Sequence, residues 1–161
     1  MAVDMFLDID GEIGGESQDK THAGTIDVLA WSWGVSQSGS FHTGGGGGAG
    51  KANFQDISVT KWIDKSSPDL MLYCANGDHF PAAKLIVRKA GKNPLEYLTI
   101  SMKKVLITSV STGGSGGEDK LTENITLNFA QVLVKYIEQT PEGGEGAKPE
   151  LKWDIAANAP L

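Results

Sequence analysis

The sequence contains few cysteines, few histidines and few positive charges, and each shortage excludes a class of protein. Cys74 is the only cysteine among 161 residues, so no intrachain disulfide can form and no zinc site can be built on paired thiolates. The three histidines are scattered, and none has a histidine partner at metal-binding spacing. With 14 basic and 20 acidic residues the net charge is −6, which argues against nucleic acid as a partner because phosphate-binding surfaces are basic.

Long hydrophobic runs are missing as well. No stretch approaches the ~18 consecutive apolar residues of a membrane helix, so we expect no membrane partner. Residues 1–10 contain three aspartates and no lysine or arginine, which is unlike the basic start and apolar stretch of a secretory signal. We therefore expect one domain, residues 1–161, that folds in the cytoplasm and has no signal peptide.

Alternation of apolar and polar residues predicts strands along most of the chain. We expect them at residues 3–9, 25–36, 54–63, 83–89, 97–111, 121–137 and 151–155. One helix of about two turns is expected, with Ser67 as its cap, Pro68 at its first position and Asn76-Gly77 as its stop. Seven strands and one short α-helix predict a mainly β fold, a two-sheet β-barrel or sandwich, with the helix closing a barrel end or lying across a sheet.

The two longest predicted strands should each present small polar residues on their outer face. The inward side chains are expected to be Leu98, Ile100, Met102, Leu106 and Val110 on one strand and Ile125, Leu127, Phe129 and Leu133 on the other. The outward side chains are expected to be Thr99, Ser101, Lys103, Ser109 and Ser111, with Asn124, Thr126 and Asn128. Ser115 either continues this surface at a glycine-rich hairpin tip or is an ordinary exposed turn residue.

Three glycine-containing patterns invite an enzymatic interpretation, and each lacks the context that the chemistry needs. Residues 45–51 match a phosphate-binding loop, but Ala52 supplies no hydroxyl for Mg²⁺ and a strand is expected where the motif needs a helix. The same run matches G-x-G-x-x-G without a surrounding βαβ unit. Residues 113–117 match a nucleophile elbow, yet no histidine follows His79. We expect no enzyme, no cofactor and no metal site.

Two segments near the N-terminus have a distinctive sequence, Gly-Glu-Ser-Gln-Asp-Lys-Thr-His at residues 15–22 and Ile-Asp-Val-Leu-Ala-Trp-Ser-Trp-Gly at residues 26–34. They resemble the Hcp (haemolysin-coregulated protein) family of type VI secretion tube proteins. Residues 54–63, 65–68 and 111–132 fit the same pattern, and the likeness is loosest after Tyr136. The resemblance covers essentially the whole chain.

The resemblance implies a homohexamer whose rings stack into the inner tube of the type VI machine. It also implies secretion when the machine fires, effector proteins carried inside the ring, and sheath and tip (spike) proteins as further partners. The glycine-rich loop at residues 38–50 would contact a neighbouring subunit or ring through Ser38, Ser40, Phe41, His42, Gly44, Gly46 and Gly48. Lumen contacts with an effector would come from Thr99, Ser101, Ser115, Asn124, Thr126 and Asn128.

A soluble β-sandwich module that binds carbohydrate or protein is the alternative. It is suggested by four tryptophans that could stack on a ligand, Trp31, Trp33, Trp62 and Trp153. Trp31 and Trp33 should share one face of their strand. Packing in a core or interface explains these tryptophans better, because all four fall within predicted strands.

Overall fold

The computed structural model of the chain describes residues 3–10, 13–39 and 50–161. The strands are β1 (Val3–Asp8), β2 (Ile26–Ser32), β3 (Val35–Ser36), β4 (Asn53–Phe54), β5 (Ile57–Trp62), β6 (His79–Lys89), β7 (Glu96–Thr112), β8 (Thr122–Tyr136), β9 (Glu150–Asp154) and β10 (Ala159–Pro160). The single helix of the described chain is α1 (Ser67–Asn76), between β5 and β6. The predicted mainly β fold with one short helix is confirmed.

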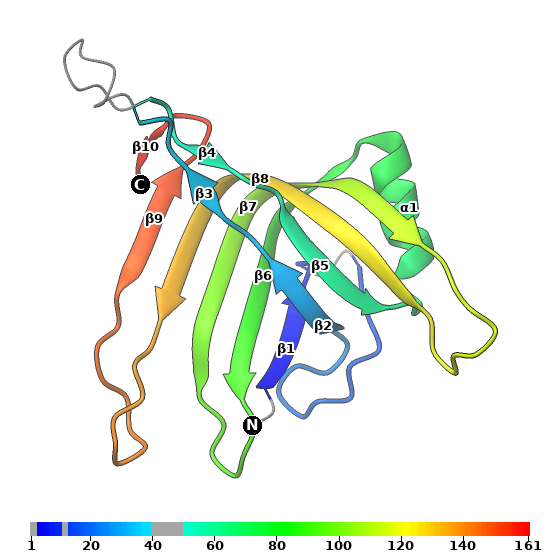
Figure 1. Ribbon diagram of the computed structural model, residues 1–161, viewed down its shortest axis with the longest axis horizontal. Coiled ribbons are helices and arrows are strands. Elements are labelled where there is room, and N and C mark those ends of the chain that lie inside the picture. Colours follow the sequence, from blue (N-terminus) through cyan, green and yellow to red (C-terminus); the bar gives the residue numbers. More distant parts are fainter. Residues whose placement is uncertain (1–2, 11–12, 40–49) are drawn as a thin grey trace.

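Six strands form a closed barrel (Figure 1). Their order is β8-β5-β2-β1-β6-β7, all neighbours are antiparallel, and β7 pairs again with β8 to close the circle. β9 and β10 extend the sheet beyond the C-terminal half of β8. β3 and β4 form a separate two-stranded ribbon, which passes across the front of the barrel in Figure 1.

Two strands that the sequence predicts as continuous are each divided in two. β2 ends at Ser32 and β3 begins at Val35, while β4 ends at Phe54 and β5 begins at Ile57. At the break the backbone N–H of Gln55 donates to the carbonyl of Gly34 at 2.9 Å, so both strands leave the barrel together and continue as the ribbon. The prediction also missed β10 and started β6 four residues late, at Ala83, because Pro81 argues against a strand interior.

Helix α1 begins one residue earlier than predicted, with Ser66 as its N-cap. The Ser67 hydroxyl instead accepts from the backbone N–H of Asp64 at 3.0 Å and bonds the carboxylate of Glu123. Ten residues make nearly three turns, and Gly77 ends the helix in the left-handed conformation, φ 73°. Leu70 is fully buried in the barrel core, as expected of a helix that closes a barrel end. Within the described chain no helix has the length and apolar character needed to cross a membrane.

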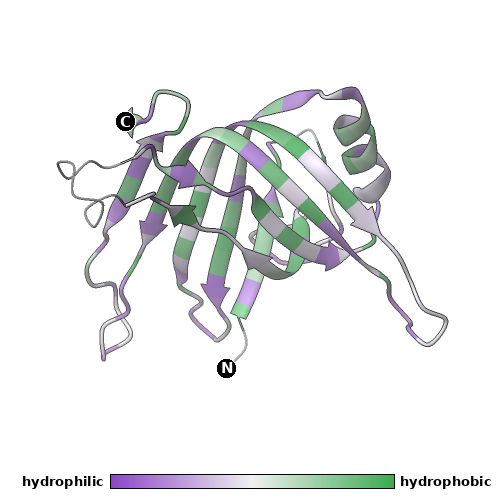
Figure 2. Ribbon diagram, turned by 45° about the horizontal axis from the view of Figure 1, so that its top comes forward, coloured by the Kyte–Doolittle hydropathy of each residue, from purple (hydrophilic) through white to green (hydrophobic). Residues whose placement is uncertain are grey.

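The alternation of inward and outward side chains shifts by one residue along a line across the barrel wall. Lys104, at φ 57°, lies opposite Pro81 on β6 and Ala130 on β8, and none of the three takes a ladder pairing with the others. Inward residues therefore change from Ile100 and Met102 to Val105 and Ile107. The prediction that Leu106 and Leu133 face inward is wrong, because unbroken alternation was assumed: these two residues pair with the outward Asn128 and Ser101. Figure 2 shows the remaining alternation along the long strands.

Residues 14–25 cover part of the outer face of β1 and β6. Phe6 and Ile86 are buried there outside the main core, and the His22 ring lies 4.8 Å from the Phe6 ring. Arg88 fastens this segment: its Nη2 lies 2.5 Å from Asp19 Oδ1 and 3.1 Å from Asp4 Oδ2. The hydrogen bonds from Arg88, and then those from Thr21 and His22, hold the pKa of the Asp19 carboxyl well below its usual range despite partial burial.

Candidate functional site

A continuous outer surface of small, uncharged polar side chains covers the four-stranded part of the barrel formed by β2, β5, β8 and β7. Its first row runs Ser32, Ser58, Thr126, Ser109, each paired in register with the next. A second row runs Ala30, Thr60, Asn124, Ser111. We call the polar members together with Asn128 the polar wall: Ser32, Ser58, Thr60, Ser109, Ser111, Asn124, Thr126 and Asn128.

Hydrogen bonds between side chains of neighbouring strands stabilise the polar wall. Thr60 Oγ1 donates to Asn124 Oδ1 at 2.6 Å. Thr126 Oγ1 lies 2.7 Å from Ser109 Oγ and 2.6 Å from Thr108 Oγ1. Thr108 reaches the wall because the pairing of β7 with β8 shifts between Ile107 and Ser109. The side chains of Thr60, Asn124, Ser109 and Thr126 therefore already have partners, so this part of the wall offers weak, exchangeable contacts rather than a charged pocket.

The structure brings together only part of the predicted lumen set. Asn124, Thr126 and Asn128 lie on the polar wall, with both asparagines exposed. Thr99 and Ser101 lie on β7 beyond the shift at Lys104, where their partners are Lys135 and Leu133 on β8. Lys84 and Lys135 pair with Ser101 and Thr99 there, so that region is more basic than the polar wall.

Two further predicted positions lie outside the wall. Ser115 is exposed in the connection after β7, where its carbonyl accepts from the backbone N–H of Glu118 at 3.2 Å. Ser38 is exposed at the base of the glycine-rich loop, and its carbonyl accepts from the N–H of Gly50 at 3.4 Å. The remaining predicted loop residues, Ser40, Phe41, His42, Gly44, Gly46 and Gly48, lie outside the described residues.

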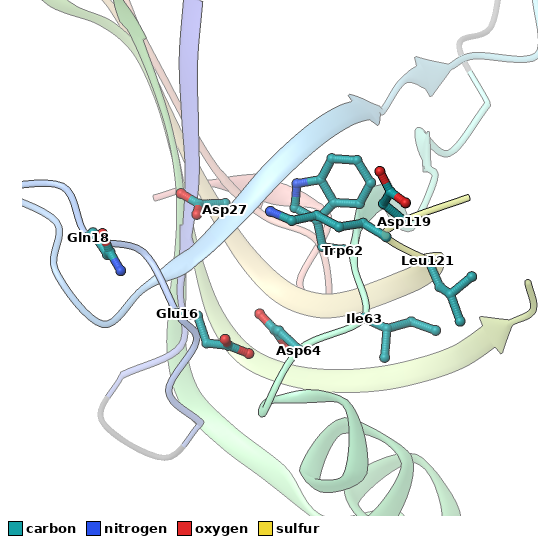
Figure 3. A pocket seen from close by; sticks show the side chains of 9 residues that line it. Glu16, Gln18, Asp27, Trp62, Ile63, Asp64, Asp119 and Leu121 are labelled. Atoms are coloured by element: carbon teal, nitrogen blue, oxygen red, sulfur yellow. The ribbon is translucent and has the colours of Figure 1, made fainter. Parts of the chain in front are cut away.

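An open groove of about 600 Å³ lies at the end of the polar wall (Figure 3). Its acidic side chains are Glu16, Asp27, Asp64 and Asp119, and Lys120 lies 5.3 Å from the Trp62 ring beside them. The carboxylates nearest to α1 already have protein donors: Glu16 accepts from the backbone N–H of Lys65 at 2.7 Å, and Asp64 accepts from that of Ser66 at 2.9 Å. The bond from Lys65 to Glu16 joins residues 14–25 to the start of α1, so the groove is a structural junction.

Both flanks of the polar wall end in strand edges that pair with no second strand within the described residues. β1 pairs with β2 only at residues 26 and 27, so residues 28–32 of β2 pair only with β5 among the described strands. On the other flank β6 pairs with β7 up to Leu106, and residues 107–112 pair only with β8 in the described part of the chain. Such edges present rows of free backbone N–H and C=O groups to another chain.

Sequence reasoning missed Ser32, Ser58, Thr60 and Thr108 as members of this surface or its network. The alternation within residues 54–63 could have placed Ser58 and Thr60 on one face, since Ile57, Val59 and Lys61 are the buried positions. Thr108 carried no signal, because it faces outward only through the register shift in β7.

Comparison with known proteins places the chain among type VI secretion proteins. Residues 6–136 match the family described as "Type VI secretion system effector, Hcp". Protein hcp1 of Pseudomonas aeruginosa is 63% identical over 160 residues, 98% of either chain. The crystal structure of Hcp1 from Salmonella typhimurium superposes with a TM-score of 0.83 at 38% identity, covering 100% of both chains. That of a type VI secretion system effector from Yersinia pestis gives 0.75 at 36% identity, covering 94% of this chain and 99% of the other.

Proposed function

The chain belongs to the Hcp family of type VI secretion proteins, and on that premise we propose that it is the subunit of a hexameric ring. Rings of this kind stack into the inner tube of the type VI machine, hold effector proteins in their lumen and leave the cell when the machine fires. Sheath and tip proteins are the further partners of such a tube. The loop at residues 38–50 contacts a neighbouring subunit or ring in this proposal.

The observation that carries the proposal is the pair of open edges on the two flanks of one sheet. A closed ring needs a heterologous contact, in which one surface of a copy meets a different surface of the next. The open edge of β7 meets the open edge of β2 of the next copy. β7 runs antiparallel to β2 through the intervening strands, so the added pair continues the antiparallel order. The sheet then runs from copy to copy around the ring.

The same arrangement joins the polar walls of all copies into one surface, which we assign to the lumen. Its small hydroxyl and amide side chains suit a wall that must release what it carries. The alternative of a ligand-binding module depends on free tryptophans. Trp31, Trp33 and Trp153 are partly buried and pack against the core, which supports the tube rather than the module.

Cysteine cross-linking between the two edges tests the proposal. In a Cys74→Ala background, Ala30→Cys places a thiol on exposed β2 and Ser111→Cys places one on exposed β7. With a short bismaleimide, the variant carrying both cysteines should give a ladder of bands that ends at six subunits. Each single-cysteine variant is the matched control and should stay monomeric on a denaturing gel, because a heterologous contact joins unlike edges. Efficient dimers from a single variant, or no ladder from the double variant, would contradict the proposal.

A further inference from the structure

Asp56 is a charged residue in direct contact with the otherwise uncharged polar wall. It lies between β4 and β5 and is partly buried. Its Oδ2 accepts from Thr108 Oγ1 at 2.7 Å, and its Oδ1 accepts from Asn128 Nδ2 at 2.8 Å. Through Thr108 the carboxylate is one hydrogen bond away from Thr126, at the centre of the wall. One side chain thus engages two strands of the wall, β7 and β8.

The residue before Asp56 fastens the two-stranded ribbon. The Gln55 carbonyl accepts from Trp33 Nε1 at 2.8 Å, and the Gln55 N–H donates to the Gly34 carbonyl at 2.9 Å. Trp33 also stacks on Phe54 of β4 at 5.8 Å and lies 6.1 Å from Phe129 of β8. Gln55 therefore bonds the ribbon, and the next residue, Asp56, bonds the polar wall.

We propose that Asp56 is a positioning residue that couples the polar wall to the β3–β4 ribbon, so that a change at Asn128 alters how the ribbon is held and how copies assemble. Its link to assembly rests on the proposed function, in which residues 38–50, between β3 and β4, contact a neighbouring subunit or ring. A bound protein whose carbonyl group accepts the same Asn128 N–H that Asp56 accepts competes with Asp56 for that donor. By thermodynamic linkage, the ribbon's contacts then alter the affinity of the wall for that protein by the same factor by which the bound protein alters those contacts.

A double-mutant cycle tests the coupling without any effector. Asn128→Ala removes the donor, and Asp56→Ala removes both acceptor oxygens. The first readout is the ¹⁹F signal of Trp33 in fluorotryptophan-labelled protein, identified by its loss in Trp33→Phe. The second is the protein concentration at which rings half-assemble. Each single variant should shift the Trp33 signal and raise this concentration about fivefold or more, and the double variant should add little to either.

The reciprocal exchange Asp56→Asn with Asn128→Asp provides the rescue. It restores one donor opposite one acceptor with unchanged net charge, so the Trp33 signal and the assembly concentration should return close to those of the wild type. Asp27→Asn, an exposed carboxylate of β2, is the control for loss of charge and should change neither readout.

Additive effects of the two single substitutions, or a reciprocal exchange no better than the single variants, would overturn the coupling. An unshifted Trp33 signal in Asp56→Ala would overturn the positioning role. If the wild-type chain forms no rings, the proposed function fails instead, while the Trp33 signal still decides whether Asp56 positions the ribbon.

Discussion

Lys61 and Glu123 are register partners on β5 and β8 and form an ion pair inside the barrel, where neither side chain is exposed. Lys61 Nζ also donates to the Trp62 carbonyl at 2.8 Å and lies 3.1 Å from Asp64 Oδ1. A buried charge is tolerated when hydrogen bonds and an opposite charge surround it. The pair lies at the end of the polar wall, beside the start of α1, and it joins β5 to β8 at that point.

Breaking this ion pair should destabilise the fold severely. Glu123→Ala leaves the Lys61 ammonium buried without its main partner, and such a change costs about 3 to 5 kcal/mol of unfolding free energy. Replacing both residues, Lys61→Met with Glu123→Leu, removes both charges and should recover most of that loss. Urea unfolding followed by circular dichroism measures both values. A double variant no more stable than Glu123→Ala would mean that the cost comes from packing and not from the orphaned charge.

Acid should weaken the fastening of residues 14–25 to the barrel. Because Arg88 lowers the pKa of Asp19 in the folded state, the unfolded chain binds more protons as pH falls, and the stabilisation by Asp19 is full at neutral pH and fades in acid. Asp19→Asn should therefore lower the urea midpoint at pH 7, and its difference from the wild type should narrow toward pH 3. Asp78→Asn, an exposed control, should show no such pattern. A gap that stays constant with pH would contradict this role.

Gly15 and Gly14 should differ sharply in their tolerance of a methyl group. A Cβ at Gly15 would lie 2.5 Å from the Thr25 carbonyl oxygen and 2.7 Å from Ile26 Cα, whereas the nearest atom at Gly14 is 3.6 Å away. Because the obstacles at Gly15 are backbone atoms, Gly15→Ala should cost about 1 to 3 kcal/mol, as overpacking does. Gly14→Ala is the matched control and should be nearly neutral. Equal unfolding midpoints for the two variants would show that residues 14–25 move aside freely.

A bulky charge on the polar wall should impair cargo binding at protein concentrations at which the rings are fully assembled. Thr126→Arg places a long cation among paired hydroxyl groups, and we expect rings of normal mass that retain less effector in co-purification. Thr99→Arg is the control, because Thr99 lies beyond the shift at Lys104 and should keep its cargo. The same co-purification of Ser115→Gln tests whether Ser115 continues the wall or is an ordinary exposed turn residue, the two alternatives that the sequence leaves open. Normal cargo in Thr126→Arg would remove the wall from the lumen.

Most of the fold is predictable from the sequence because period-two alternation marks long strands wherever one face is buried. Its failures have local physical causes. The change of facing at Lys104 occurs on β6, β7 and β8 together, so the pattern of one strand does not reveal it. For that reason the alternation predicts the wrong face for Leu106 and Leu133. Ser67 does not cap the helix, because its hydroxyl bonds Glu123, 56 residues away along the chain, and Ser66 at the N-cap position makes no side-chain capping bond.

The candidate site was predictable only where it lies on one strand. Asn124, Thr126 and Asn128 follow from the alternation of β8 alone, and the structure keeps them together. Thr99 and Ser101 fitted the same rule but belong to another surface, since β7 changes its facing between them and Ser109. Asp56 contributes through hydrogen bonds to Thr108 and Asn128, which lie 52 and 72 positions further along the chain, and no local pattern encodes such contacts.

The native mass in solution tests the central claim most directly. Size-exclusion chromatography with light scattering, at micromolar concentrations, should give a single species of about 102 kDa, which is six copies of the 17.0 kDa chain. That result is expected if the open edges of β2 and β7 join neighbouring copies into a closed ring. A stable species of 17 kDa across the same concentrations would contradict the account.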